Sequence, residues 1–134
     1  MKKTMLFAAA AVLALPLVAS ASPVKAGKWE VTVEGPGGKH TVTRCVTQEE
    51  ADHPQAPKMR DEDCKIDSFK VEGNTMSWKV TCAKRGASME GKTTYSGDTF
   101  TGETHMKMGE REMTQHSTGK YLGKCDGTET MPKQ

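Results

Sequence analysis

Two short stretches of the chain, VEGNTMSW at Val71–Trp78 and YSGDTFTG at Tyr95–Gly102, follow one pattern. Each has glycine, then asparagine or aspartate, then threonine, a large apolar residue, and serine or threonine. Glycine followed by asparagine or aspartate between two β-rich runs predicts a two-residue hairpin, with the glycine at the first central position of a type II′ turn. The pattern therefore recurs because each copy is a hairpin turn together with the start of the returning strand.

The register set by the first turn places apolar residues opposite one another. With Gly73-Asn74 at the turn, Val71 faces Met76 and Phe69 faces Trp78. Serine, threonine and lysine occupy the alternate positions of both strands. This alternation is typical of an antiparallel pair with one buried face and one solvated face.

The later turns continue the same pattern. Gly97-Asp98 sets Tyr95 opposite Phe100, and a third turn at Gly109-Glu110 sets Met106 opposite Met113. We therefore expect one contiguous apolar core, made of Phe69, Val71, Met76, Trp78, Val80, Tyr95, Phe100, Met106 and Met113.

Two earlier strands complete the fold prediction. Lys28–Glu34 alternates, and a turn at residues 35–38 leads into a returning strand at His40–Val46. About seven strands joined mostly by tight turns predict an all-β antiparallel meander, which hides its edges by curling into a small barrel or half-barrel. The small inward residues of the later strands permit either close packing against Tyr95 and Phe100 or an internal cavity.

One irregular segment separates the second strand from Cys64. Thr47 and Glu50 form a capping box, which predicts one or two helical turns over Gln48–His53. We expect residues 54–63 to form a polar loop and residues 126–134 to form a flexible tail.

The N-terminus has the order of a secretory signal peptide. Lys2 and Lys3 precede an apolar stretch at Met5–Val18, and Ala19-Ser20-Ala21 offers a small-x-small cleavage site. The apolar run is too short for a comfortable membrane span. We expect residues 1–21 to be removed after Ala21, leaving a soluble periplasmic or secreted protein without a membrane anchor.

Cleavage would leave a chain of balanced charge. Removal of Lys2 and Lys3 takes the basic residues from 19 to 17, which equals the 17 acidic residues. Recognition of nucleic acid needs a basic stripe with aromatic residues, so neither nucleic acid nor anionic lipid is an expected partner. The length suits a single domain, which we place at residues 22–125.

Four cysteines, Cys45, Cys64, Cys82 and Cys125, predict two disulfides in an oxidising compartment. The gaps between them contain no C-x-x-C pair, which argues against a zinc site. Four cysteines allow three connectivities.

The first hairpin favours one of these connectivities. Strict pairing from its turn places Cys64 opposite Ala83, whereas one extra residue on one strand, a β-bulge, brings Cys64 opposite Cys82. We place the bulge near Asp67, an inward acidic residue, and predict the pairs Cys64–Cys82 and Cys45–Cys125.

Several stretches together resemble a family of exported bacterial proteins catalogued as domain of unknown function 3617. They are GKWEVTVEG, CVTQEEADHP, CKIDSFKVEGNTMSWKVTC and YSGDTFTGETHMKMGEREMTQHSTGKYLGKC. The resemblance runs from about Gly27 to Cys125, with Gln48 where the family often has proline. It implies a small secreted or periplasmic β-domain with no established activity.

The outer face carries one group of candidate metal ligands. In the predicted register Glu103 faces His116, and His105 is diagonal to His116 on the same face. Two imidazoles and a carboxylate can hold Zn²⁺ or Cu²⁺ weakly, although a cross-strand His–Glu contact on a solvated face explains the same pattern. The methionines at 106, 108 and 113 fit core packing better than copper binding, so we expect no cofactor.

Catalytic signatures are missing from the sequence. No serine stands in a G-x-S-x-G elbow, and the glycines at 35–38 lack the helix that a phosphate-binding loop requires. We therefore expect a protein that is not an enzyme. Three functions remain: binding of a small apolar ligand or envelope component, a protein-binding or inhibitor module acting through exposed loops and the 48–63 segment, and weak Cu or Zn binding.

Overall fold

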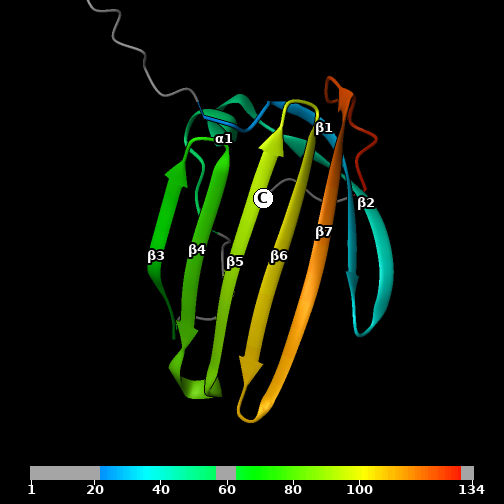
Figure 1. Ribbon diagram of the computed structural model, residues 1–134. Helices are drawn as coiled ribbons and strands as arrows, with labels where there is room; N and C mark the ends of the chain where they lie inside the picture. The colour runs from blue at the N-terminus through cyan, green and yellow to red at the C-terminus, as the bar shows by residue number, and fades with distance from the viewer. Residues whose placement is uncertain (1–21, 57–62, 131–134) are drawn as a thin grey trace, which may run out of the picture.

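The computed structural model describes residues 22–56 and 63–130, which form one seven-stranded antiparallel sheet with two short helices (Figure 1). The strands are β1 (Gly27–Gly35), β2 (Gly38–Val46), β3 (Cys64–Glu72), β4 (Thr75–Cys82), β5 (Ala87–Ser96), β6 (Thr99–Met108) and β7 (Arg111–Gly123). The helices are α1 (Gln48–Asp52) and the 3-10 turn η1 (Ala83–Arg85). None of the helices in these residues is long and apolar enough to cross a membrane.

The strand order is β2-β1-β7-β6-β5-β4-β3, so β3 to β7 form a continuous meander and the first hairpin joins it through β1 and β7. The sheet curls, and β1 and β2 turn away from the plane of the other strands (Figure 1). It does not close, because β2 and β3 remain its two edges. The predicted seven-stranded meander is confirmed, in its half-barrel form.

The hairpin turns have the predicted geometry. Gly73, Gly97 and Gly109 have φ angles of 58°, 64° and 59°, and no described residue other than glycine has a positive φ. A type II′ turn requires this combination. The cross-strand pairs expected from the turns, such as Tyr95 with Phe100, are present.

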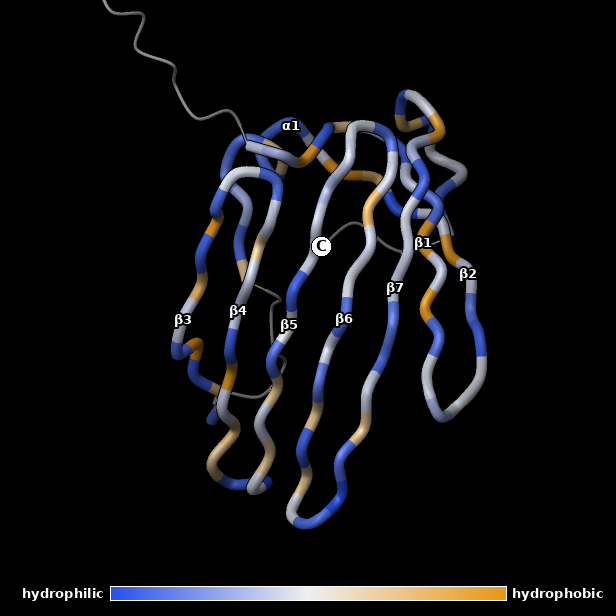
Figure 2. Tube along the Cα trace, in the orientation of Figure 1, coloured by the Kyte–Doolittle hydropathy of each residue, from blue (hydrophilic) through white to orange (hydrophobic). Residues whose placement is uncertain are grey.

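The register places serine, threonine, lysine and glutamate side chains on the outer face of the sheet. Figure 2 shows hydrophilic residues along the length of the strands. One row of this face holds a threonine on six neighbouring strands: Thr75, Thr94, Thr101, Thr118, Thr32 and Thr41. The hydroxyls of Thr32 and Thr41 lie 3.0 Å apart, within hydrogen-bond distance. Such cross-strand pairs stabilise the register.

The core differs from the predicted set. Its centre is Trp29, which is 1% exposed and has ring contacts with Tyr95, Phe100 and Tyr121 at centroid distances of 6.0, 5.5 and 5.5 Å. The indole N–H of Trp29 donates a hydrogen bond to the Lys25 carbonyl, at 2.8 Å.

Only Val80 of the predicted core residues is fully buried, and Val71 is 40% exposed. The core prediction is therefore wrong for Val71, and most of the other predicted residues are half-buried. The physical reason is that a single open sheet leaves the inner face of its edge strand β3 with a neighbour on one side only.

Asp67 is the predicted β-bulge. The β3–β4 register shifts between Ile66 and Ser68, and this shift brings Cys64 opposite Cys82. The structure contains the disulfides Cys64–Cys82 and Cys45–Cys125, which are the two pairs expected from the sequence.

The segment after Cys125 has defined contacts as far as residue 130. Asp126 forms an ion pair with Lys28 at 3.2 Å, and hydrogen bonds from Thr128 and Lys28 lower the pKa of Asp126 to about 2. Thr43 and Thr130 exchange hydrogen bonds between the backbone N–H of each and the hydroxyl of the other, at 2.8 and 2.9 Å. These contacts attach residues 126–130 to the β1–β2 hairpin, where the sequence predicted a flexible tail.

Three parts of the sequence predictions lie outside the described residues: the signal segment 1–21, residues 57–62 of the predicted loop and residues 131–134 of the predicted tail.

Candidate ligand-binding site

A cavity of about 610 Å³ lies between the inner face of the sheet and the segment that contains α1. Its floor is formed by side chains from three neighbouring strands: Met76, Trp78, Thr93, Tyr95 and Phe100. The N-terminal segment, β2 and the residues that follow α1 supply apolar walls: Val24, Val46, Pro54 and Ala56. The rest of the walls is polar and comes from β2, α1 and the residues next to α1: Arg44, Thr47, Glu49, Glu50, His53 and Gln55. The cavity therefore has a largely aromatic floor and walls that are partly apolar and partly polar.

Helix α1 forms because its first turn is capped. The Thr47 hydroxyl accepts from the Glu50 N–H, and the Glu50 carboxylate accepts from the Thr47 N–H at 2.8 Å. This is the predicted capping box. The helix buries Ala51, which is 2% exposed, and so stays against the sheet.

Glycines position the aromatic rings of the floor. A Cβ atom on Gly91 would overlap with the ring of Trp78, and one on Gly119 would overlap with the ring of Phe100. The absence of these side chains lets each ring lie across the neighbouring strand. Thr93, another of the small inward residues, lines the cavity. The two outcomes predicted for the small inward residues, close packing and a cavity, thus both occur.

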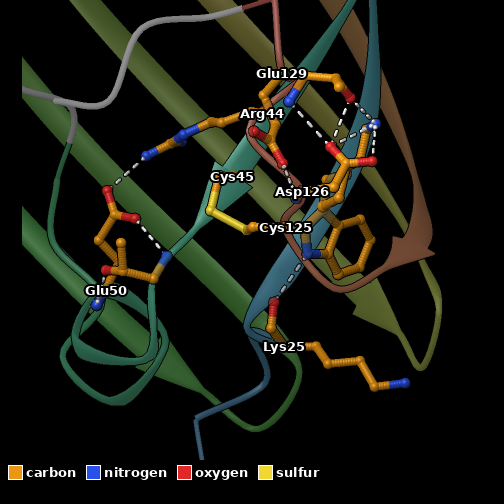
Figure 3. The surroundings of a disulfide bond; sticks show 11 residues. Lys25, Arg44, Cys45, Glu50, Cys125, Asp126 and Glu129 are labelled. Carbon is orange, nitrogen blue, oxygen red and sulfur yellow. Dashed lines mark hydrogen bonds and ion pairs between the residues drawn. A yellow bond between two sulfur atoms is a disulfide. The ribbon is translucent and has the colours of Figure 1, made fainter.

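Two of the charged residues that line the cavity form an ion pair. Arg44 pairs with Trp29 across β1 and β2, so its side chain belongs to the inner face. Its guanidinium lies 3.1 Å from one oxygen of Glu50, and the Thr47 N–H bonds the other oxygen (Figure 3). Burial acts to raise the pKa of Glu50, but the Thr47 N–H and the charge of Arg44 outweigh it and lower that pKa.

Tyr95 contributes a polar group to the floor. Burial raises the pKa of its hydroxyl, and the positive charge of Arg44 opposes this shift. Among the residues that the structure describes, the Tyr95 hydroxyl has no hydrogen-bond partner. It is therefore a donor available to a molecule in the cavity.

The metal ligands predicted on the outer face lie close together in pairs. One oxygen of Glu103 is 2.5 Å from Nε2 of His105, and its other oxygen is 3.5 Å from Nδ1 of His116. Nδ1 of His105 is also within 3.0 Å of the Thr114 hydroxyl. This is the cross-strand His–Glu contact that was the alternative to a metal site.

Within residues 22–56 and 63–130, the only three ligand atoms from His, Cys, Asp or Glu that lie within 4.8 Å of one another belong to Cys45, Cys125 and Glu129. Both sulfur atoms of that group are in a disulfide (Figure 3). Metal binding by cysteine requires the thiolate, so this group has no thiolate to offer.

Sequence reasoning did not identify Arg44 as a site residue. The signal was its position between Val42 and Val46, because these three residues share one face of a strand and the other two are apolar. An arginine on an apolar face indicates a buried partner or a ligand.

A comparison with protein families gives one match. The family described as "Protein of unknown function (DUF3617)" matches residues 24–125, which include all seven strands and every residue of the cavity lining. No curated protein and no solved structure matches the chain.

Proposed function

Because the chain belongs to the DUF3617 family, whose description names no reaction and no ligand, we propose from its geometry that it is an exported, non-catalytic protein that binds a small apolar ligand. The ligand lies in the cavity between α1 and the inner face of the sheet. The observation that carries this proposal is the aromatic floor of a cavity of about 610 Å³.

The size and chemistry of the cavity support binding. Ligand sites have volumes of roughly 300–1,000 Å³ and combine apolar walls with a few polar groups that orient the ligand. Here the polar groups include the Arg44–Glu50 pair, the free Tyr95 hydroxyl and the side chains of Glu49, His53 and Gln55. The described residues that line the cavity include neither serine nor cysteine, the commonest catalytic nucleophiles, which favours binding over catalysis.

The architecture also favours a ligand. Most domains bury the apolar face of a sheet against a second layer. In the described residues only α1 and its flanking segments cover the inner face at this end, and Trp78 stays half-buried beside them. An apolar molecule in the cavity would cover the remaining part of this face.

Two features support export. The order of residues 1–21 is that of a secretory signal peptide, with a site for cleavage after Ala21. The two disulfides are of the kind that persists in an oxidising compartment such as the periplasm.

Titration with N-phenyl-1-naphthylamine, a neutral apolar fluorophore, tests the proposal. We expect its fluorescence to rise on binding to the purified protein. Thr93→Phe fills the cavity from the floor and should abolish the rise, because aromatic residues are tolerated in strands and the new ring occupies the ligand space.

The matched control is Thr94→Phe, which adds the same ring to the outer face one residue along the strand. It should bind the fluorophore like the original protein. No fluorescence rise in the original protein, or equal losses in both variants, would contradict the proposal.

A further inference from the structure

Arg44 is a cation on the inner face of β2, where its two neighbours on that face are apolar. It stands opposite the buried Trp29 and between Val42 and Val46 on the inner side of β2. Its side chain is 42% exposed, and it lines the cavity. An arginine side chain has five N–H donors in a planar fork, and Glu50 is held through one of its nitrogens, at 3.1 Å. Donors of Arg44 therefore remain for a second acceptor.

Glu50 does not depend on Arg44. One of its oxygens accepts from Arg44, whereas the other accepts from the Thr47 N–H in the capping box. If a ligand took the guanidinium, Glu50 would keep its bond to the helix N-terminus. The ion pair can thus be exchanged without leaving a carboxylate unpaired.

Tyr95 supplies a second donor at the same place. Its hydroxyl has no partner among the described residues, and Tyr95 lines the same cavity as Arg44. A guanidinium and a phenol that line one cavity are donors suited to an anion with two oxygens.

We propose that the ligand is an apolar molecule with one carboxylate, whose oxygens accept from Arg44 and Tyr95 while its tail lies on Trp78 and Phe100. A medium-chain or long-chain fatty acid has this chemistry. The inference rests on the proposed function and names its ligand class.

A cationic ligand is the main competitor. Trp78, Tyr95 and Phe100 with the acidic Glu49 resemble an aromatic cage for a quaternary ammonium group. The positive charge of Arg44 in the same lining opposes such a ligand, and Glu50 is already shared between Thr47 and Arg44. The remaining donors of Arg44 therefore favour the anion, and Glu49 is the group in the lining that opposes it.

Three probes with the same twelve-carbon chain separate these possibilities: dodecanoate, dodecan-1-ol and dodecyltrimethylammonium. Each displaces N-phenyl-1-naphthylamine at pH 7, below its micelle concentration. Dodecanoate should bind about tenfold more tightly than dodecan-1-ol, since a charge-assisted hydrogen bond contributes roughly this much.

Two variants that break the same ion pair should move the affinity for dodecanoate in opposite directions. Arg44→Gln removes the cation, so dodecanoate should lose about tenfold in affinity while dodecan-1-ol changes little. Glu50→Gln keeps an acceptor for the Thr47 N–H but frees Arg44, so dodecanoate should bind more tightly. Loss of the ion pair alone would shift both variants in the same direction, and circular dichroism checks that both are folded.

Each other outcome overturns a stated part. Equal affinities for dodecanoate and dodecan-1-ol, unchanged in Arg44→Gln, would refute the proposal that the ligand carries a carboxylate bound by Arg44. Binding of an apolar ligand in the cavity would still stand. Tighter binding of dodecyltrimethylammonium would replace the anion by a cation. If neither dodecan-1-ol nor the fluorophore binds, both the proposed function and the proposed carboxylate ligand are refuted.

Discussion

Gly119 and Phe100 occupy one space in the core. They face each other across β6 and β7, and the ring of Phe100 lies where a side chain on Gly119 would be. Phe100 cannot easily turn away, because it packs against Trp29 and Tyr95 at centroid distances of 5.5 and 5.3 Å. The aromatic cluster therefore depends on a residue with no side chain.

Gly119→Ala should lower the free energy of unfolding by about 1–3 kcal/mol, since the methyl group overlaps with the Phe100 ring and forces the cluster to shift. Denaturant unfolding measures the change. The control is Gly37→Ala, where a Cβ meets nothing within 4 Å and φ is not positive. It should stay within about 0.5 kcal/mol of the original protein. Equal effects of the two substitutions would refute this role of Gly119.

At the scale of the element, two features fix the pairing of strands β3 and β4. The turn at Gly73 fixes the pairing of Phe69 with Trp78, and the disulfide fixes the pairing of Cys64 with Cys82. The number of residues on the two strands differs by one, and Asp67 is the extra residue. The bulge is the physical consequence of this count.

Deletion of Asp67 should therefore keep the hairpin and its disulfide. The strands would then match residue for residue from Phe69–Trp78 to Cys64–Cys82, and no side chain would change face. A thiol assay on the denatured protein should find no free cysteine. Deletion of Lys79 is the contrasting variant, because it increases the mismatch and reverses the faces of Trp78 and its neighbours on one side. The Lys79 deletion should expose free thiols or prevent folding. The same result for the Asp67 deletion would contradict the conclusion that Asp67 is the one extra residue of β3.

At the scale of the molecule, contacts between nearby residues could be predicted and those between distant segments could not. Tyr95 and Phe100 face each other across a two-residue turn, so the turn sequence sets their register. Trp29 meets Tyr121 only because β1 inserts between β2 and β7, a pairing of opposite ends of the chain that no local pattern encodes. The cavity follows the same rule, since the capping box predicts α1 but not that α1 folds over the sheet and brings Glu50 to Arg44.

The Cys45–Cys125 disulfide holds this long-range arrangement together. Both Cys45 and Gly123 stand opposite Lys28 of β1, so the bridge runs from β2 to the end of β7 past the strand between them. The cysteines are separated by 80 residues, against 18 for Cys64–Cys82. Arg44 and Val46 of the cavity flank Cys45 on β2.

Replacing Cys45 and Cys125 by alanine should therefore lower both the free energy of unfolding and the affinity for an apolar ligand. On chain-entropy grounds the loss is about 4–5 kcal/mol, compared with about 3 kcal/mol for the Cys64/Cys82 pair. Denaturant unfolding of both double variants measures this difference.

N-phenyl-1-naphthylamine binding tests the effect on the cavity, and it is measured at a temperature where both variants are folded. The affinity should fall in Cys45→Ala/Cys125→Ala, because β2 and Arg44 are no longer fixed beside the floor, and it should persist in Cys64→Ala/Cys82→Ala, whose bridge lies at the opposite end of β4 from Met76. Two results would show that the cavity does not depend on the junction of β1, β2 and β7. One is unchanged fluorophore binding in Cys45→Ala/Cys125→Ala, and the other is loss of fluorophore binding in Cys64→Ala/Cys82→Ala.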